Sequence, residues 1–346
     1  MSKILYQINP VVKDKDWQDY VKNHPKGNIY HLSQWKMILE KSFNFSPFYI
    51  FAINKNKICG FLPLFQIKSF ITGQRLVSLP FAYVCGPIAD SREIEKGLIQ
   101  QAVNLSKEKK CQVEIRGFEN KNINWQYHNY FSTYILKLSK NIPEVWQGLD
   151  YSNIRRSVKK AEKRGVTVIN QKNIKNFKIF HQLDIVHKRN LGSPSHPWSL
   201  IKNIHDYFDE NVGLYLAKYQ EKFIGGILTL NFKDTVIYVY GAADKKYLSL
   251  GANSLLLWEA IQESCNKGYK YFDFGRVAMD NAGVIRYKRN WSTQEKKLFY
   301  YYYPKLKRNL FNNHQNIKYR ILTNLWKKMP KTVSVYLSRL IYKHLE

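Results

Sequence analysis

Cysteine is scarce in this sequence, and its four copies lie far apart, at Cys59, Cys85, Cys111 and Cys265. No CxxC pair occurs, which excludes a zinc site of the usual spacing. A disulfide framework is not expected in a chain of 346 residues with so few cysteines. We therefore expect reduced, mostly buried thiols, which fits the cytoplasm.

Long apolar runs are missing as well. No run approaches the roughly 18 residues that a membrane-spanning helix needs. The first residues, MSKILYQ, hold no apolar run followed by a small-residue cleavage site, so we expect no signal peptide. The sequence predicts a cytoplasmic protein that is soluble or lies peripherally on the inner face of the membrane.

The familiar catalytic motifs are absent too. The sequence contains no GxSxG, no GxxxxGK[ST] and no GxGxxG, so hydrolase, P-loop and Rossmann functions have no motif support. His181, Asp184 and His187 are spaced by three and fan over about 120° of a helix, unlike the i, i+4 pair of a metal-binding helix. We expect no metal site.

Acidic residues are few, with 26 Asp and Glu against 55 Lys and Arg, which gives a net charge of +29. This excess predicts an anionic partner, either a nucleic acid, a phosphorylated metabolite or an anionic membrane surface, unless it reflects a general bias toward lysine. Hydrophobic residues make up 45% of the chain, which excludes disorder throughout. The length suggests two domains.

Two parts of the chain repeat one order of elements. Each begins with helix-patterned segments, at 31–43 in the first part and at 174–190 and 198–208 in the second. Strands then follow at 48–53, 58–67 and 76–84, or at 213–219, 223–232 and 236–240. A helix and a last strand close each part, at 93–109 and 111–115, or at 253–265 and 270–274. The pattern predicts an α+β fold of two similar domains, at 1–145 and 146–304.

The segment 305–346 is different, because it carries ten Lys or Arg and one acid, Glu346. Apolar residues recur there at helical spacing, and Pro330 divides them into two stretches. A basic amphipathic helix with Trp and Tyr suits an anionic membrane interface, which makes peripheral membrane contact one interpretation. The alternative is that these helices pack on the protein's own domains.

Three segments carry candidate chemistry. Residues 152–164, SNIRRSVKKAEKR, place Arg155, Lys159 and Lys163 in one helical row and Arg156, Lys160 and Arg164 in the next. This cationic stripe is either a binding surface for phosphates or a solvated helix face. In YFDFGR, Gly275 permits close backbone approach, and Arg276 either holds an anionic substrate group or pairs with Asp273. In GVIRYKRNW, a desolvated Lys288 beside an aromatic residue could stabilise an oxyanion.

Taken together, these segments resemble the FemABX-type aminoacyltransferases, which are relatives within the GNAT acyltransferase superfamily. The resemblance rests on residues 146–166, RNLGSP at 189–194, Gly225-Gly226, residues 255–276, and GVIRYKRNW ahead of LFYYYY at 298–303. A weaker likeness covers residues 29–43. It implies two tandem GNAT-like domains and N-acyl transfer to an amine. In peptidoglycan-building members the donor is aminoacyl-tRNA and the acceptor is a phosphate-bearing muropeptide, so both are co-substrates and no resident cofactor is expected.

The resemblance also suggests roles for individual residues. The family's aromatic–lysine pair falls on Tyr287 and Lys288, although the family usually has Phe at the first position, and Lys288 would face the reacting carbonyl. Asp273, Gly275 and Arg276 would line the same site. The family's basic helix corresponds to Arg155, Arg156, Lys159 and Lys160. Trp35 and Lys36 correspond to the first domain's contribution to the acceptor cleft.

The sequence also departs from related patterns. A GNAT enzyme that uses acetyl-CoA usually carries [Q/R]xxGx[G/A] at a helix start, whereas residues 248–253 read LSLGAN, and the first and last positions do not fit. The sequence therefore favours aminoacyl transfer to an amine of a cell-envelope precursor. One alternative is an acyl-CoA-dependent enzyme acting on an amino sugar or amino acid. A second is a non-catalytic module that binds RNA or membrane.

Overall fold

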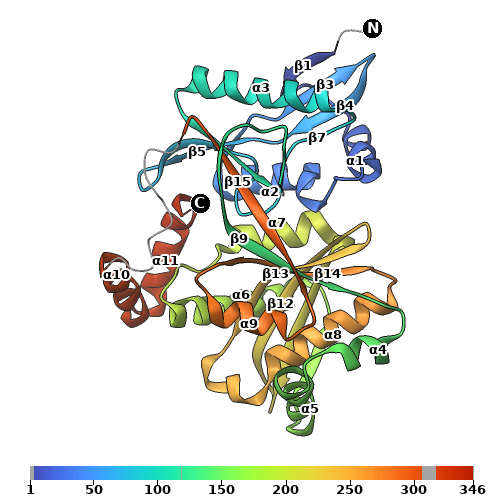
Figure 1. Cartoon of the computed structure of the whole chain (residues 1–346). Helices are drawn as coiled ribbons and strands as arrows, with labels where there is room; N and C mark the ends of the chain where they lie inside the picture. Colours follow the sequence, from blue (N-terminus) through green and yellow to red (C-terminus); the bar gives the residue numbers. More distant parts are fainter. Residues whose placement is uncertain (1–3, 118, 306–316, 346) are drawn as a thin grey trace. The chain divides into compact units, whose positions relative to one another are not determined.

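The structure is a computed structural model that describes residues 4–117, 119–305 and 317–345. The chain forms two compact units (Figure 1): unit 1 comprises residues 1–131, 297–309 and 343–346, and unit 2 comprises residues 132–296 and 310–342. The boundary crosses two strands, β9 (Gln126–Lys137) and β15 (Gln294–Tyr303). The predicted α+β class is confirmed, because both units combine helices with mixed sheets.

Unit 1 contains two groups of strands. One is a four-stranded sheet in the order β1-β3-β4-β7, and the other follows the order β15-β8-β6-β5-β2. The elements are β1 (Leu5–Ile8), α1 (Asp14–Asn23), α2 (Ser33–Phe43), β2 (Ser46–Pro47), β3 (Ile50–Asn54), β4 (Lys57–Leu62), β5 (Phe65–Ser69), β6 (Gly73–Val77), β7 (Ile88–Ala89), α3 (Arg92–Lys109) and β8 (Gln112–Gly117). One hydrophobic core of unit 1 lies between α3 and strands β3 and β4.

Two strands expected in unit 1 are shorter than predicted, and a proline accounts for each. The predicted strand 58–67 is divided at Pro63 into β4 and β5, which belong to different sheets, because proline supplies no ladder donor. The predicted strand 76–84 ends at Val77. Pro80 follows, and Phe81 takes a left-handed backbone with φ of 65° that no strand continues through.

Unit 2 holds a sheet in the order β10-β11-β12-β13-β14, continued by residues 132–137 of β9. The elements are α4 (Ile142–Gly148), a π-helical turn η2 (Tyr151–Arg155), α5 (Arg156–Lys163), β10 (Thr167–Asn170), α6 (Ile174–Leu191), α7 (Trp198–Phe208), β11 (Val212–Tyr219), β12 (Lys222–Phe232), β13 (Thr235–Ala243), η4 (Lys245–Leu250), α8 (Ala252–Asn266), β14 (Tyr271–Ala278), α9 (Ala282–Arg289), α10 (Ile317–Lys328) and α11 (Lys331–Ile341). The helices predicted at 174–190 and 198–208 are confirmed as α6 and α7.

Consecutive glycines on β12 show that helices cover both faces of this sheet. A Cβ atom at Gly225 would lie 3.4 Å from Leu256 of α8, whereas one at Gly226 would lie 3.1 Å from Phe180 of α6. Because neighbouring residues of a strand face opposite sides, α8 lies on one face and α6 on the other. The main core of unit 2 fills the α8 face, where residues of α5, α8 and β14 pack together.

The helices near the C-terminus pack on α6. Arg189 donates from Nε to the Met329 carbonyl oxygen at 2.8 Å, and a Cβ atom at Gly192 would lie 2.5 Å from the Thr323 carbonyl oxygen. The predicted helical tail is therefore confirmed for α10 and α11, while residues 306–316 and Glu346 lie outside the described part of the chain. Among described residues, no helix is both long and apolar enough to cross a bilayer.

Candidate active site

Lys288 is buried in the last turn of α9. This helix begins at an Asn281 side chain, which accepts a hydrogen bond from the Val284 N–H at 3.2 Å. The Lys288 residue is only 6% exposed, and its Nζ donates to the carbonyl oxygens of Gly275 at 2.5 Å and Arg276 at 3.3 Å. An ammonium group has three N–H donors, so one remains beyond these two contacts with described residues.

The surroundings of Lys288 weaken its charge. Burial lowers the pKa of this ammonium to about 8, the buried Asp273 carboxylate opposes the change, and the Arg276 guanidinium adds to it. The Tyr134 ring centroid lies 5.9 Å from Nζ. A buried cation of this kind attracts a developing negative charge much more strongly than a solvated lysine does.

Gly275 shapes the part of β14 whose carbonyl oxygens accept the hydrogen bonds of Lys288. Its φ is +71°, a region that disfavours side chains, and a Cβ atom would lie 3.1 Å from the Tyr238 carbonyl oxygen on β13. Its N–H donates to Asp273 Oδ1 at 2.8 Å, and the same oxygen accepts a hydrogen bond from the Thr133 hydroxyl on β9. The predicted group of Asp273, Gly275 and Lys288 is thus brought together, with Thr133 as a member that the sequence did not identify.

The parallel pairing of the strands beside this group is short. β13 and β14 pair in parallel from Thr235 with Tyr271 to Ile237 with Asp273, and both continue well beyond this pairing. The ladder between β13 and β12 also shifts register at Val239, where an extra residue bulges between Tyr238 and Tyr240. Gly275 therefore lies just beyond the last residue pair of the parallel ladder, and its carbonyl oxygen accepts a hydrogen bond from Lys288.

Tyr287, the predicted partner of Lys288, faces the core. Its ring packs edge-on against the fully buried Trp291 with centroids 6.3 Å apart, and burial raises the pKa of its phenol. Its hydroxyl is buried without a hydrogen bond of ordinary geometry to a described residue. In this structure Tyr287 contacts the packing that holds α9 in place, and Lys288 alone of the pair contacts Gly275 and Arg276.

The predicted basic stripe is confirmed as a one-sided helix surface. Val158 and Ala161 are buried against α8, while Arg156, Lys159 and Lys160 are exposed and Arg155 is half-buried over the Tyr151 ring. The structure gives none of the six basic residues of the stripe an ion pair among the described residues. The stripe begins near the end of α9, because the Asp150 N–H donates to the Asn290 carbonyl oxygen at 3.0 Å.

The two predicted residues of the first domain lie on α2 in unit 1. Trp35 is 2% exposed, and its ring centroid is 5.7 Å from that of Tyr30. Lys36 is half-buried, and its charge lowers the pKa of Glu40 one turn later, while burial of that carboxyl raises it more strongly. The contacts of both residues lie within unit 1, and their role at an acceptor site stays a prediction.

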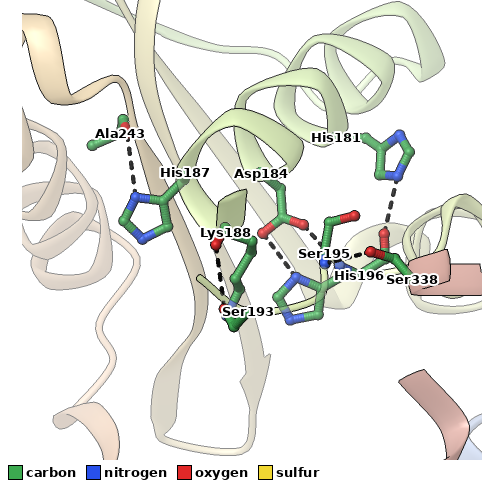
Figure 2. A network of polar contacts seen from close by, with 9 residues as sticks. All are labelled: His181, Asp184, His187, Lys188, Ser193, Ser195, His196, Ala243 and Ser338. Carbon is green, nitrogen blue, oxygen red and sulfur yellow. Dashed lines mark hydrogen bonds and ion pairs between the residues drawn. The ribbon is translucent and has the colours of Figure 1, made fainter. Parts of the chain in front are cut away.

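A second polar group, which the sequence only partly indicated, lies on the α6 face of the sheet (Figure 2). Asp184 is fully buried and accepts two hydrogen bonds from His196, from its backbone N–H at 2.9 Å and from its ring Nδ1 at 2.8 Å. His181 contacts the His196 carbonyl oxygen at 3.0 Å, and His187 contacts that of Ala243 at 3.2 Å. Among described residues, no acidic, histidine or cysteine cluster is arranged to hold a metal ion.

Comparisons with known proteins agree with this architecture. Residues 151–289 match the family model of an acetyltransferase (GNAT) domain, which includes α5, β13, α8 and Lys288. No curated protein sequence is significantly similar to the chain.

Solved structures resemble most of the chain at low sequence identity. FemX is 16% identical with a TM-score of 0.64, covering 86% of this chain and 97% of its own. The C-terminal domain of a proposed lysylphosphatidylglycerol synthetase from Agrobacterium fabrum is 11% identical with a TM-score of 0.56, covering 83% and 90%. A tandem GNAT protein from the clavulanic acid biosynthesis pathway is 9% identical with a TM-score of 0.52, covering 88% and 100%.

These likenesses confirm the predicted fold of tandem GNAT-like domains. The family match places the GNAT domain in unit 2, where it includes β13, β14 and Lys288. Residues 151–289 therefore form a GNAT acyltransferase domain, and the chain as a whole has the fold of FemX and of a tandem GNAT protein.

Proposed function

We propose that this acyltransferase moves an aminoacyl group from aminoacyl-tRNA to an amine of a phosphate-bearing cell-envelope precursor. The observation that carries the proposal is the basic face of α5. Arg156, Lys159 and Lys160 are exposed on one side of the helix, and no described acid neutralises them. Such a surface suits an extended polyanion better than a single small phosphate.

The start of α8 supports a donor other than acyl-CoA. A Cβ atom at Gly251 would lie 2.5 Å from the Ser157 carbonyl oxygen, so an acceptor group of α5 lies against this turn. Arg164 of the stripe also donates to the Ser249 carbonyl oxygen at 3.3 Å. A pyrophosphate needs N–H donors, and a nearby carbonyl oxygen repels it. The turn before α8 thus packs against α5 and its basic stripe.

Lys288 has a direct role in the proposed reaction. The acceptor amine attacks the carbonyl carbon of the aminoacyl ester, and the carbonyl oxygen becomes an oxyanion. The free N–H of Lys288 Nζ donates to that oxyanion, while Gly275 and Arg276 hold the ammonium in place. One such donor contributes on the order of 3 kcal/mol to the transition state. Binding both large substrates in one orientation adds a further entropic contribution.

Acyl transfer from acyl-CoA is the second candidate. It is favoured by the family model, whose description is an acetyltransferase domain. Two reactions separate the candidates, one with labelled aminoacyl-tRNA and one with labelled acetyl-CoA, each with an extract of envelope precursors. Transfer of label from tRNA alone supports our proposal, and transfer from acetyl-CoA alone overturns it. The K288M variant should lose at least about 100-fold in turnover with the correct donor. The rate of transfer without enzyme does not change.

We further propose that α10 and α11 contact an anionic membrane surface. Ser334 and Ser338 of α11 are buried, whereas Tyr336 is 63% exposed, and Leu322 on α10 is 65% exposed. The apolar side chains thus point outward, and basic residues flank them at 327, 328, 331 and 339. This combination suits the interface of an anionic bilayer, where apolar groups insert and lysines meet lipid phosphates.

Vesicle sedimentation tests this contact. The protein should bind vesicles that contain phosphatidylglycerol and should not bind pure phosphatidylcholine vesicles at physiological salt. The double variant L322D/Y336D should reduce binding while leaving soluble-donor turnover unchanged, because neither side chain contacts the Lys288 site. Equal binding by the variant and the wild type would exclude this surface.

A further inference from the structure

Strand β14 presents two consecutive carbonyl oxygens to one cation. Lys288 Nζ donates to the carbonyl oxygen of Gly275 at 2.5 Å and to that of Arg276 at 3.3 Å. Successive carbonyl groups of a regular strand point to opposite edges, so one side chain does not normally contact two in a row. The backbone at Gly275, with φ of +71°, interrupts this alternation and turns both carbonyl groups toward the ammonium.

Two acceptors fix an ammonium group more completely than one does. A single acceptor leaves the long lysine stem free to swing about that contact. Once two of the three N–H bonds are directed at the Gly275 and Arg276 carbonyl oxygens, the third has one direction left. That N–H is the donor that meets the oxyanion in the proposed reaction. A donor lowers the barrier most when it is aimed before the reaction begins.

The Asp273 carboxylate holds the turn at Gly275. Its Oδ1 accepts a hydrogen bond from the Gly275 N–H at 2.8 Å, two residues along the chain, which is the contact of an Asx turn. Asp273 is only 6% exposed, so this contact is largely shielded from water. The direction of the two carbonyl groups therefore depends on the position of one buried carboxylate.

Thr133 connects this turn with a neighbouring strand. It is fully buried on β9, which lies next to β14 in the sheet. Its hydroxyl donates to the same Asp273 Oδ1 that accepts the Gly275 N–H. A carboxylate can rotate about its bond to Cβ, and a second donor on a separate strand removes that freedom. A continuous series of contacts within unit 2 thus joins β9, through the turn, to the ammonium of Lys288.

We propose that Thr133 and Asp273 are positioning residues for acyl transfer, because they fix the turn that aims the Lys288 ammonium at the oxyanion. This inference rests on the proposed role of Lys288. Thr133 touches no reacting atom, and its contribution reaches the substrate only through Asp273, the turn and Lys288. No proton moves along the series in this role. The hydroxyl, the carboxylate and both carbonyl groups keep their bonds while the new amide forms.

A pair of substitutions tests whether Thr133 acts through Lys288. Thr133→Val keeps the shape of the side chain and removes the hydroxyl. We expect T133V to lower kcat by about 10- to 100-fold with little change in KM, because the ammonium loses its aim while substrate binding is kept. In the K288M background there is no ammonium to position, so the same substitution should cost less than about twofold further. Losses that multiply, or a T133V variant as fast as the wild type, would overturn the inference.

Two further variants separate positioning from packing. Thr133→Ser retains the hydroxyl and should recover most of the kcat that T133V loses. Thr229→Val removes the hydroxyl of another buried threonine of the same sheet, on β12, and should leave kcat unchanged. If T133S were as slow as T133V, the loss would come from packing and the positioning role would be wrong.

Hydrogen exchange gives a measurement that needs no donor. The Gly275 N–H bonds to Asp273, so its exchange rate reports whether the turn is held. Exchange should be faster in T133V than in the wild type and unchanged in T133S, and equal rates in all three would overturn the connection between Thr133 and the turn. The two proposals fail separately, because absence of transfer from either donor by the wild-type protein overturns the proposed function and leaves the exchange result unaffected.

Discussion

Replacing Lys288 with methionine should make the stability of this protein respond differently to pH. Methionine keeps an unbranched apolar stem of similar length and removes the ammonium that lies within hydrogen-bonding distance of the Gly275 and Arg276 carbonyl oxygens. In the folded chain burial lowers the pKa of this ammonium from 10.5 to about 8. An unfolded lysine keeps its ordinary pKa, so the two states bind different numbers of protons between these values.

The sign follows from proton binding. Between about pH 8 and pH 10.5 the unfolded chain holds more protons on Lys288 than the folded chain, so the stability of the wild type rises with pH in this window. Below about pH 8 the full cost of burying the charge is present, about 3 kcal/mol at about 1.4 kcal/mol per pKa unit. From pH 7.5 to pH 10 the wild type should gain about 2 kcal/mol relative to K288M.

Urea unfolding of both proteins at the two pH values measures this difference. Changes in all other titrating groups, including the many tyrosines, are common to both proteins and cancel in the comparison. Lys222→Met provides a control, because Lys222 is exposed at the start of β12 and its removal should leave the pH profile parallel to that of the wild type. A constant difference between K288M and wild type would show that the ammonium is not desolvated, and the oxyanion role would lose its electrostatic basis.

Three further predictions concern the same unit. Gly275→Ala should lower stability by more than about 1 kcal/mol and reduce turnover. Gly268→Ala is the control, because its φ is +79° but a Cβ there meets open space, so it should lower stability only. Equal turnover of the two variants in kinetic assays would contradict the role of Gly275. Lys159→Gln with Lys160→Gln should weaken donor binding and flatten its salt dependence by up to about two in the log–log slope, and an unchanged slope would remove α5 from the interface. Gly192→Ala should loosen α10 through the Thr323 contact, seen as faster hydrogen exchange there, and unchanged exchange would refute it.

Much of the fold can be predicted from hydrophobic periodicity alone. The helix predicted at 198–208 has the same bounds as α7. The helix predicted at 93–109 begins one residue later than α3, and that predicted at 253–265 is one residue shorter than α8 at each end. These segments combine clear apolar spacing with Asn, Ser, Gly or Pro at the first turn. The shorter strands around Pro63 and Pro80 were harder to predict, because apolar runs there continue past residues that cannot take part in a ladder.

The candidate site could be predicted only in part. Lys288, Gly275 and Asp273 belong to neighbouring segments of the sequence, and the structure brings them together. Thr133 is 140 residues away from its partner Asp273, and no local pattern relates them. The buried pair of Asp184 and His196, a polar group separate from the Lys288 site, gave a weaker signal that could have been used. Asp184 falls at helical spacing with Phe177 and Phe180, and an acid on a buried helix face needs a partner.

The hydrogen bond between Ser195 and Ser338 connects α11 with the loop that holds Ser195 and His196. A ligand that binds the outer face of α11 stabilises this loop as well. Anything that orders the loop stabilises the packed position of α11 by the same free energy. Tyr342, which contacts the imidazole ring, extends this connection. Binding at the membrane surface should therefore order the loop that holds Ser195 and His196.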